Sequence, residues 1–173
     1  MNATSLLSNT ELSAPNLPGL VADSLLKRGW MLATAESCTG GLIAAACTDL
    51  AGSSQWFERG FVTYSNDAKT ELLGVDADLI ARDGAVSESV VRSMAQGALA
   101  RSRAQVAVAV TGIAGPSGGS AAKPVGTVWL AWATPQSLRS EVQCFSGDRA
   151  AVRAATVQHA LRVLEALLQT AGP

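Results

Sequence analysis

The stretch TAESCTGG, residues 34–41, connects two apolar segments that have different patterns. The short apolar run before it indicates a strand over 30–35, and the longer run after it indicates a buried helix over about 39–50. This pattern places Ser37 at a strand-to-helix turn, beside the unpaired N–H groups of a helix N-terminus. Those groups can stabilise an oxyanion during catalysis or simply bind an anion, so the stretch alone leaves both possibilities open.

Apolar patterns along the rest of the chain indicate an α/β fold. Further helices are expected over 17–28, 67–73, 77–82, 88–101 and 149–168, and further strands over 61–64, 106–110, 125–133 and 139–145. The run 106–110 is apolar at every position, which is typical of a central strand buried on both faces. These elements predict a three-layer α/β/α sandwich with a mixed, mostly parallel sheet. A flexible N-terminal arm over 1–16 is expected to precede a single domain over 17–170.

The composition narrows the classes of function. Of the 173 residues, 48% are hydrophobic and 16% are charged, as in an ordinary globular domain. The net charge of −1 argues against a nucleic-acid partner. Three cysteines, with no export signal or membrane-spanning stretch visible, predict reduced thiols, a cytoplasmic location and no membrane partner. No CxxC or HExxH pattern occurs, and the single histidine is His159, so no metal site is expected.

A serine nucleophile needs a base, and the sequence offers few candidates. His159 falls in the middle of the last helix, where a plain surface position is the favoured interpretation. A neutral lysine is the usual replacement, and Lys69 follows the strand that ends at Tyr64, the only tyrosine. Burial in a cleft there would lower the pKa of the amine. From spacing alone, however, an exposed helix lysine facing Asp67 or Glu71 is favoured.

Other residues near these segments allow more than one interpretation. Cys38 is a rival nucleophile, although packing under the helix start is its expected role. The glycine-rich loop 111–119 follows a buried strand, where ligands gather in open α/β sheets, but it matches neither a P-loop nor a dinucleotide fingerprint. Arg149 and Arg153 open the last helix and are equally compatible with a phosphate site or with a capped surface helix.

Six motifs in order, AESCTGG, FERGFVTYSNDAK, GAVSE, TGIAGPSGG, KPVGTVW and FSGDR, closely resemble the C-terminal domain family of the competence/damage-inducible protein CinA. The resemblance covers about 17–168 and implies the same three-layer fold. It implies hydrolysis of the carboxamide of nicotinamide mononucleotide (NMN) to nicotinate mononucleotide and ammonia, a step of pyridine nucleotide salvage. By motif, Ser37 would be the nucleophile and Lys69 the base, assisted by Tyr64. Ser117 stands where many members carry an acidic residue.

On this interpretation the remaining site residues bind the substrate. Backbone N–H groups near Thr39 and Gly40 would hold the oxyanion. The substrate phosphate would lie on Arg149, on Arg153 or on the loop that contains Thr111, Gly112 and Gly115, and the three are not ranked. No metal or organic cofactor is needed, and a homo-oligomer is expected. The alternatives are a nucleotide-binding module without catalysis and an interaction protein linked to DNA uptake.

Overall fold

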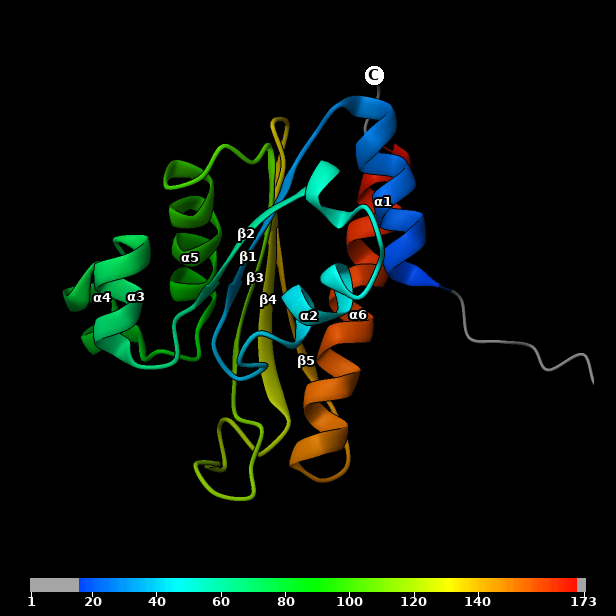
Figure 1. Ribbon diagram of the computed structural model, residues 1–173. Coiled ribbons are helices and arrows are strands. Elements are labelled where there is room, and N and C mark those ends of the chain that lie inside the picture. The colour runs from blue at the N-terminus through cyan, green and yellow to red at the C-terminus, as the bar shows by residue number, and fades with distance from the viewer. Residues whose placement is uncertain (1–15, 171–173) are drawn as a thin grey trace, which may run out of the picture.

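The computed structural model describes residues 16–170 as three layers, with a central sheet between two groups of helices (Figure 1). The strands are β1 (Leu32–Glu36), β2 (Phe57–Val62), β3 (Val106–Gly112), β4 (Thr127–Ala133) and β5 (Leu138–Cys144). The α-helices are α1 (Leu17–Arg28), α2 (Leu42–Thr48), α3 (Asn66–Leu73), α4 (Ala77–Asp83), α5 (Glu88–Ala100) and α6 (Arg149–Thr170), and a short 3₁₀ turn spans Ser53–Gln55. Helices α1, α2 and α6 lie on one face of the sheet, and α3, α4 and α5 lie on the other.

The sheet has the order β2-β1-β3-β4-β5 and is mixed. Strand β1 pairs in parallel with β2 and with β3, whereas β4 is antiparallel to both β3 and β5. Strand β4 is therefore the one strand of this sheet that runs against the others. The predicted α/β class and three-layer arrangement are confirmed, with β3 at the centre as expected.

The two faces of β3 carry side chains of different size. Val106, Val108 and Val110 belong to the core beneath α1 and α6. Ala107 and Ala109 belong to the core beneath α5, where small side chains let the helix lie close to the sheet. Alternation of side chains across a strand thus produces two separate cores from one apolar run.

Some predicted boundaries are wrong, and the backbone explains the most informative of them. Helix α2 begins at Leu42 instead of about residue 39, because Gly40 and Gly41 have φ values of 61° and 100°. This left-handed backbone cannot continue a right-handed helix. Strand β2 begins at Phe57, earlier than predicted. The prediction missed its first residues because this edge strand lacks the alternation of buried and exposed side chains that marks a half-buried strand.

Most of the predicted N-terminal arm lies outside the described residues. Within the described chain, helix α1 begins after Asn16, whose side chain accepts a hydrogen bond from the Gly19 N–H at 3.1 Å. None of the described helices is long and apolar enough to cross a membrane.

Candidate active site

Three parallel strands bring distant parts of the chain to one edge of the sheet. Strand β1 ends at Glu36, immediately before Ser37, and β2 ends shortly before Thr63. The Ser37 N–H donates to the Val110 carbonyl at 3.1 Å, and the Thr63 N–H donates to the Glu36 carbonyl at 2.8 Å. These bonds continue the ladders past the strand ends, so Ser37 is held at the carboxyl edge of the sheet, where ligands bind in open α/β folds.

Lys69 reaches Ser37 from α3. Its Nζ lies 3.1 Å from the Ser37 Oγ, and the exposed fractions of the two residues are 1% and 8%. The ammonium or amine also donates to the backbone carbonyls of Thr63, Tyr64 and Ser65, at 2.9, 3.3 and 3.4 Å. The expectation of an exposed helix lysine facing Asp67 or Glu71 is therefore wrong.

The environment of Lys69 shifts its proton equilibrium toward the neutral amine. Burial lowers the pKa of Lys69, and a weaker influence of the nearby Cys38 raises it. Within the described chain, Lys69 forms no ion pair with a carboxylate that would hold its proton. A neutral amine has two N–H groups and one lone pair. Carbonyls can accept from the N–H groups while the lone pair faces the Ser37 hydroxyl, which is the arrangement that a general base requires.

Glu36 is a site residue that sequence reasoning missed. Its carboxylate is 1% exposed and lies at the start of α2. It accepts hydrogen bonds from Thr39 Oγ1 (2.6 Å) and from the N–H groups of Gly41 (3.1 Å), Ile43 (3.0 Å) and Ala44 (2.8 Å). The free helix N-terminus that the sequence predicts is therefore occupied by this carboxylate. A glutamate just before the turn was the available signal, because carboxylates cap helix N-termini.

The Glu36 contacts and the hydrogen bond between Gly40 and Ser37 change which N–H groups can serve as oxyanion donors. The Gly40 N–H donates to the Ser37 carbonyl at 3.0 Å, so it is not free to bind an oxyanion and its predicted role is wrong. The N–H groups of Cys38 and Thr39 lie near the Cys38 sulfur, and a protonated thiol is only a weak acceptor. Thr39 therefore remains a candidate donor, and Cys38 joins it.

Cys38 does not have the properties of a rival nucleophile. Burial, with a smaller contribution from the adjacent Glu36 charge, raises the pKa of the Cys38 thiol to about 11. The reactive form of cysteine is the thiolate, which this environment disfavours. Lys69 Nζ lies 3.1 Å from the Ser37 Oγ, so the base candidate is at Ser37 and the geometry favours that residue.

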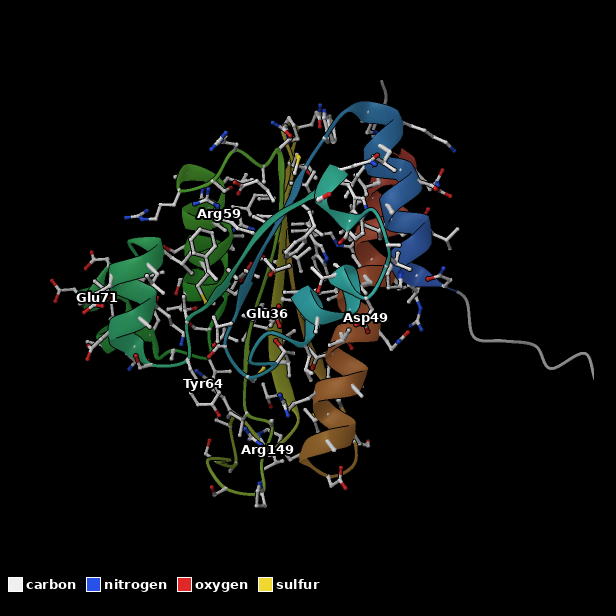
Figure 2. All side chains as sticks on the ribbon, in the orientation of Figure 1. Glu36, Asp49, Arg59, Tyr64, Glu71 and Arg149 are labelled. Atoms are coloured by element: carbon white, nitrogen blue, oxygen red, sulfur yellow. The ribbon has the colours of Figure 1, made fainter. Side chains whose placement is uncertain are left out.

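Tyr64 and Arg149 point toward one another across the mouth of the site (Figure 2). The Arg149 Nη2 donates to the Tyr64 hydroxyl at 3.0 Å, and its Nη1 donates to the Gly115 carbonyl at 3.1 Å. Tyr64 is 60% exposed, and its contact with Lys69 is through its backbone carbonyl. The phenol hydroxyl therefore lies at the arginine, and not between Lys69 and Ser37 as a proton relay would require.

A cavity of about 630 Å³ opens beside these residues. It is lined by Ala114, Pro116, Val125, Gly147, Asp148, Arg149, Ala150 and Arg153. Arg149 is exposed at its rim, whereas the half-buried Arg153 donates from Nε to the Cys38 carbonyl (3.2 Å) and from Nη2 to the Thr39 carbonyl (2.9 Å). The two arginines, which the sequence could not distinguish, thus have different surroundings.

The three predicted loop residues, Thr111, Gly112 and Gly115, mostly make contacts within the protein. The Thr111 hydroxyl donates to the Ala85 carbonyl at 2.9 Å. Gly112 lies against β4, where a Cβ would come within 2.7 Å of Val128 Cγ2, and Gly115 has a φ of 80°. Lys123 donates to the Val86 carbonyl at 2.7 Å and so fixes the far end of the loop. The contacts of Thr111 and Gly112 are those of packing residues, while Gly115 binds Arg149.

His159 lies away from Ser37, on the part of α6 that covers β5. It is half-buried, pairs with Glu141, and contacts the rings of Trp132 and Phe145. The expected plain surface position is therefore wrong, but its exclusion as the base agrees with the geometry. In the described part of the chain, no group of three or more His, Cys, Asp or Glu residues is arranged to hold a metal ion.

Comparison with known proteins identifies the class to which this fold and site belong. The family model of the CinA C-terminal domain matches residues 15–168, and the chain belongs to that family. Solved relatives include competence damage-inducible protein A from Klebsiella pneumoniae (TM-score 0.87, 43% identity, covering 90% of this chain and 97% of that one). A competence/damage inducible protein from Agrobacterium tumefaciens is similar too (TM-score 0.84, 48% identity, covering 89% and 96%).

Curated relatives of similar length carry a more specific name. Nicotinamide-nucleotide amidohydrolase PncC of Escherichia coli (strain K12) is 53% identical over 156 residues, which are 90% of this chain and 94% of that protein. The protein of the same name from Pseudomonas putida is 58% identical over 136 residues, covering 79% of this chain and 83% of that protein.

Proposed function

We propose that this chain is an amidohydrolase that converts NMN and water to nicotinate mononucleotide and ammonia, through an acyl-enzyme on Ser37. The observation that carries the proposal is the buried contact between Lys69 Nζ and Ser37 Oγ at 3.1 Å, without a carboxylate partner for Lys69 in the described chain. Relatives that are more than half identical to this chain bear the name of this activity. The product would return the pyridine ring to pyridine nucleotide salvage.

The first half-reaction follows from the geometry of Ser37 and Lys69. Neutral Lys69 takes the hydroxyl proton while Ser37 Oγ attacks the carboxamide carbon, which the pyridinium ring makes electrophilic. The carbonyl oxygen becomes an oxyanion that the N–H groups of Cys38 and Thr39 stabilise, at about 3 kcal/mol for each good donor. The protonated Lys69 then gives its proton to the leaving nitrogen. The C–N bond breaks, and ammonia leaves with the acyl group on Ser37.

The second half-reaction uses the same groups in reverse. Water enters the position that ammonia vacated, and Lys69 removes its proton as it attacks the ester carbon. The second tetrahedral intermediate collapses, Lys69 returns the proton to Ser37 Oγ, and nicotinate mononucleotide leaves. No metal ion or organic cofactor enters any step.

We infer that Arg149 is the residue that binds the substrate phosphate. Arg149 is exposed, lines the cavity and stands at the first turn of α6. Arg153 is half-buried and donates to two backbone carbonyls of the turn, whereas Arg149 is exposed and donates to the Gly115 carbonyl and the Tyr64 hydroxyl. We therefore assign the phosphate to Arg149, with Tyr64 placing the guanidinium and bordering the substrate.

Ammonia release from NMN by the purified, metal-free protein tests the proposal. Ser37→Ala should lower kcat by a factor on the order of 10⁴ or more, as loss of a nucleophile does in other serine hydrolases. NMN binding, measured by calorimetry, should persist in that variant. Ser137→Ala, in the turn between β4 and β5 at the opposite end of the sheet, is the matched control. Binding of NMN by the wild-type protein without ammonia release would support the nucleotide-binding alternative instead.

A further inference from the structure

Two groups of opposite charge bind the segment that carries Ser37, which we define as the nucleophile turn, residues 37–41. The Glu36 carboxylate binds donors of this turn and of α2. The Arg153 guanidinium binds its carbonyl acceptors from α6. The turn is thus held from the end of β1 and from α6, and neither charged group forms an ion pair within the described chain.

The Glu36 carboxylate fixes the end of the nucleophile turn relative to α2. One carboxylate oxygen accepts from Thr39 Oγ1, the Gly41 N–H and the Ile43 N–H, and the other accepts from the Ala44 N–H. Glu36 is 1% exposed, so bulk solvent does not reach these contacts. Hydrogen bonds to a buried charged group are strong, so the turn and the first turn of α2 form one rigid unit.

The Arg153 contacts determine which way the turn N–H groups point. In a planar trans peptide, the carbonyl of one residue and the N–H of the next point in opposite directions. Because Arg153 holds the Cys38 carbonyl at 3.2 Å, the Thr39 N–H points away from the guanidinium. Because the Ser37 carbonyl accepts from the Gly40 N–H at 3.0 Å, the Cys38 N–H points away from Gly40.

We propose that Glu36 and Arg153 are positioning residues that set the peptide planes of the nucleophile turn, so that the N–H groups of Cys38 and Thr39 face the reacting carbonyl. This inference rests on the proposed amidohydrolase function and extends it. In this proposal both side chains act through the turn and not through a contact with the reacting carboxamide. Arg153 acts through the carbonyls of the turn, whereas Arg149 binds the substrate phosphate.

Substitutions at the two arginines distinguish positioning from phosphate binding. Arg153→Lys can hold only one turn carbonyl well, and it should lower kcat by about 10- to 100-fold with little change in KM. The loss should be the same for NMN and for nicotinamide riboside, which lacks the phosphate. Arg149→Lys should instead weaken NMN use alone. Arg162→Lys, on the exposed face of α6, is the matched control. An Arg153→Lys variant that raises KM for NMN only, and behaves normally with the riboside, would overturn the proposal.

Glu36→Gln tests the other side of the turn. The amide keeps the shape of the side chain but presents an NH₂ group to at least one backbone N–H, which disrupts the arrangement. The variant should lose about 100-fold in kcat. Glu58→Gln makes the same change near the start of β2, at the end of the strand away from Thr63, and should retain full activity. Circular dichroism establishes whether each variant is folded. If Glu36→Gln is unfolded, the result for Arg153→Lys alone tests the positioning proposal.

A second readout keeps the inference separate from the NMN reaction. A fluorophosphonate reacts when Ser37 Oγ attacks phosphorus, fluoride leaves, and the phosphoryl oxygen occupies the oxyanion position. Mass spectrometry of the Ser37 peptide should show labelling that is about 10- to 100-fold slower in Glu36→Gln and Arg153→Lys than in wild type. If wild type labels but releases no ammonia from NMN, the proposed function fails while the positioning remains testable. Equal labelling rates in folded variants and wild type would refute the positioning.

Discussion

Lys69→Met should alter the pH dependence of folding stability as well as abolish activity. Lys69 is 1% exposed, and burial lowers the pKa of its amine below the ordinary value of 10.5. Between that lowered pKa and 10.5, the unfolded chain holds a proton at Lys69 that the folded chain lacks. The free energy of unfolding of the wild-type protein therefore rises with pH across this window. Methionine has no proton to bind, so this contribution is absent from the variant.

The size of the effect follows from proton linkage. One proton of difference between the unfolded and folded states changes the free energy of unfolding by about 1.4 kcal/mol per pH unit. The advantage of Lys69→Met over wild type should thus be largest at the low end of the window and shrink as the pH rises. Between pH 7 and 9 the difference should fall by up to about 2.8 kcal/mol, the full value applying if the lowered pKa is below 7.

Urea unfolding of both proteins, at half-unit steps from pH 6 to 9, measures this difference. The range stops at pH 9 because burial raises the pKa values of Cys38 and Cys47 to about 11 and about 12, which adds an opposite slope at higher pH. Lys27→Met, the same substitution at an exposed amine on α1, provides the baseline. In wild type, kcat/KM should rise with pH through the same lowered pKa, because only neutral Lys69 is a base. Stability curves that run parallel throughout would mean that folded Lys69 keeps its proton, which would refute its role as the base.

Three other substitutions test the site and the packing. Arg149→Ala should raise KM for NMN by about 10- to 100-fold in steady-state assays, with kcat within a few-fold, because a charged phosphate contact is lost. Tyr64→Phe should cost less than about tenfold in kcat, since its hydroxyl contacts Arg149; a loss near 10³ would restore the proton-relay interpretation. Gly97→Ala should lower the free energy of unfolding by about 1–3 kcal/mol in urea titrations, because its Cβ would lie 2.1 Å from the Leu73 carbonyl oxygen; a stabilised variant would contradict this packing.

The fold was predictable where side-chain periodicity reports burial. The uninterrupted apolar run of β3 identified the central strand, and Gly29 and Gly74, both left-handed, ended helices where expected. The prediction was weaker for β2, an edge strand whose residues are stabilised by pairing with β1 more than by burial. It also extended α2 too far, because residue types do not reveal that Gly40 and Gly41 are both left-handed.

The site was predictable in its residues and less so in its contacts. Spacing alone favoured an exposed Lys69, and only the resemblance to a family pointed to the arrangement that the structure shows. The contact with Ser37 depends on the chain reversal at the Ser65 cap, which bonds the Ala68 N–H at 3.0 Å. The partners of Glu36 and Arg153 are mostly backbone groups, which every residue carries, and sequence patterns cannot reveal such contacts.

The placement of Glu36 also bears on the base. A carboxylate next to a buried lysine favours the charged form and would raise the pKa of that lysine, removing its ability to accept a proton at neutral pH. Glu36 is one residue from Ser37, yet its four hydrogen bonds all go to the turn and to α2. Lys69 instead meets uncharged carbonyls and a hydroxyl. Because the Glu36 charge is directed into the start of α2, it holds the nucleophile turn without offsetting the effect of burial, which lowers the pKa of Lys69.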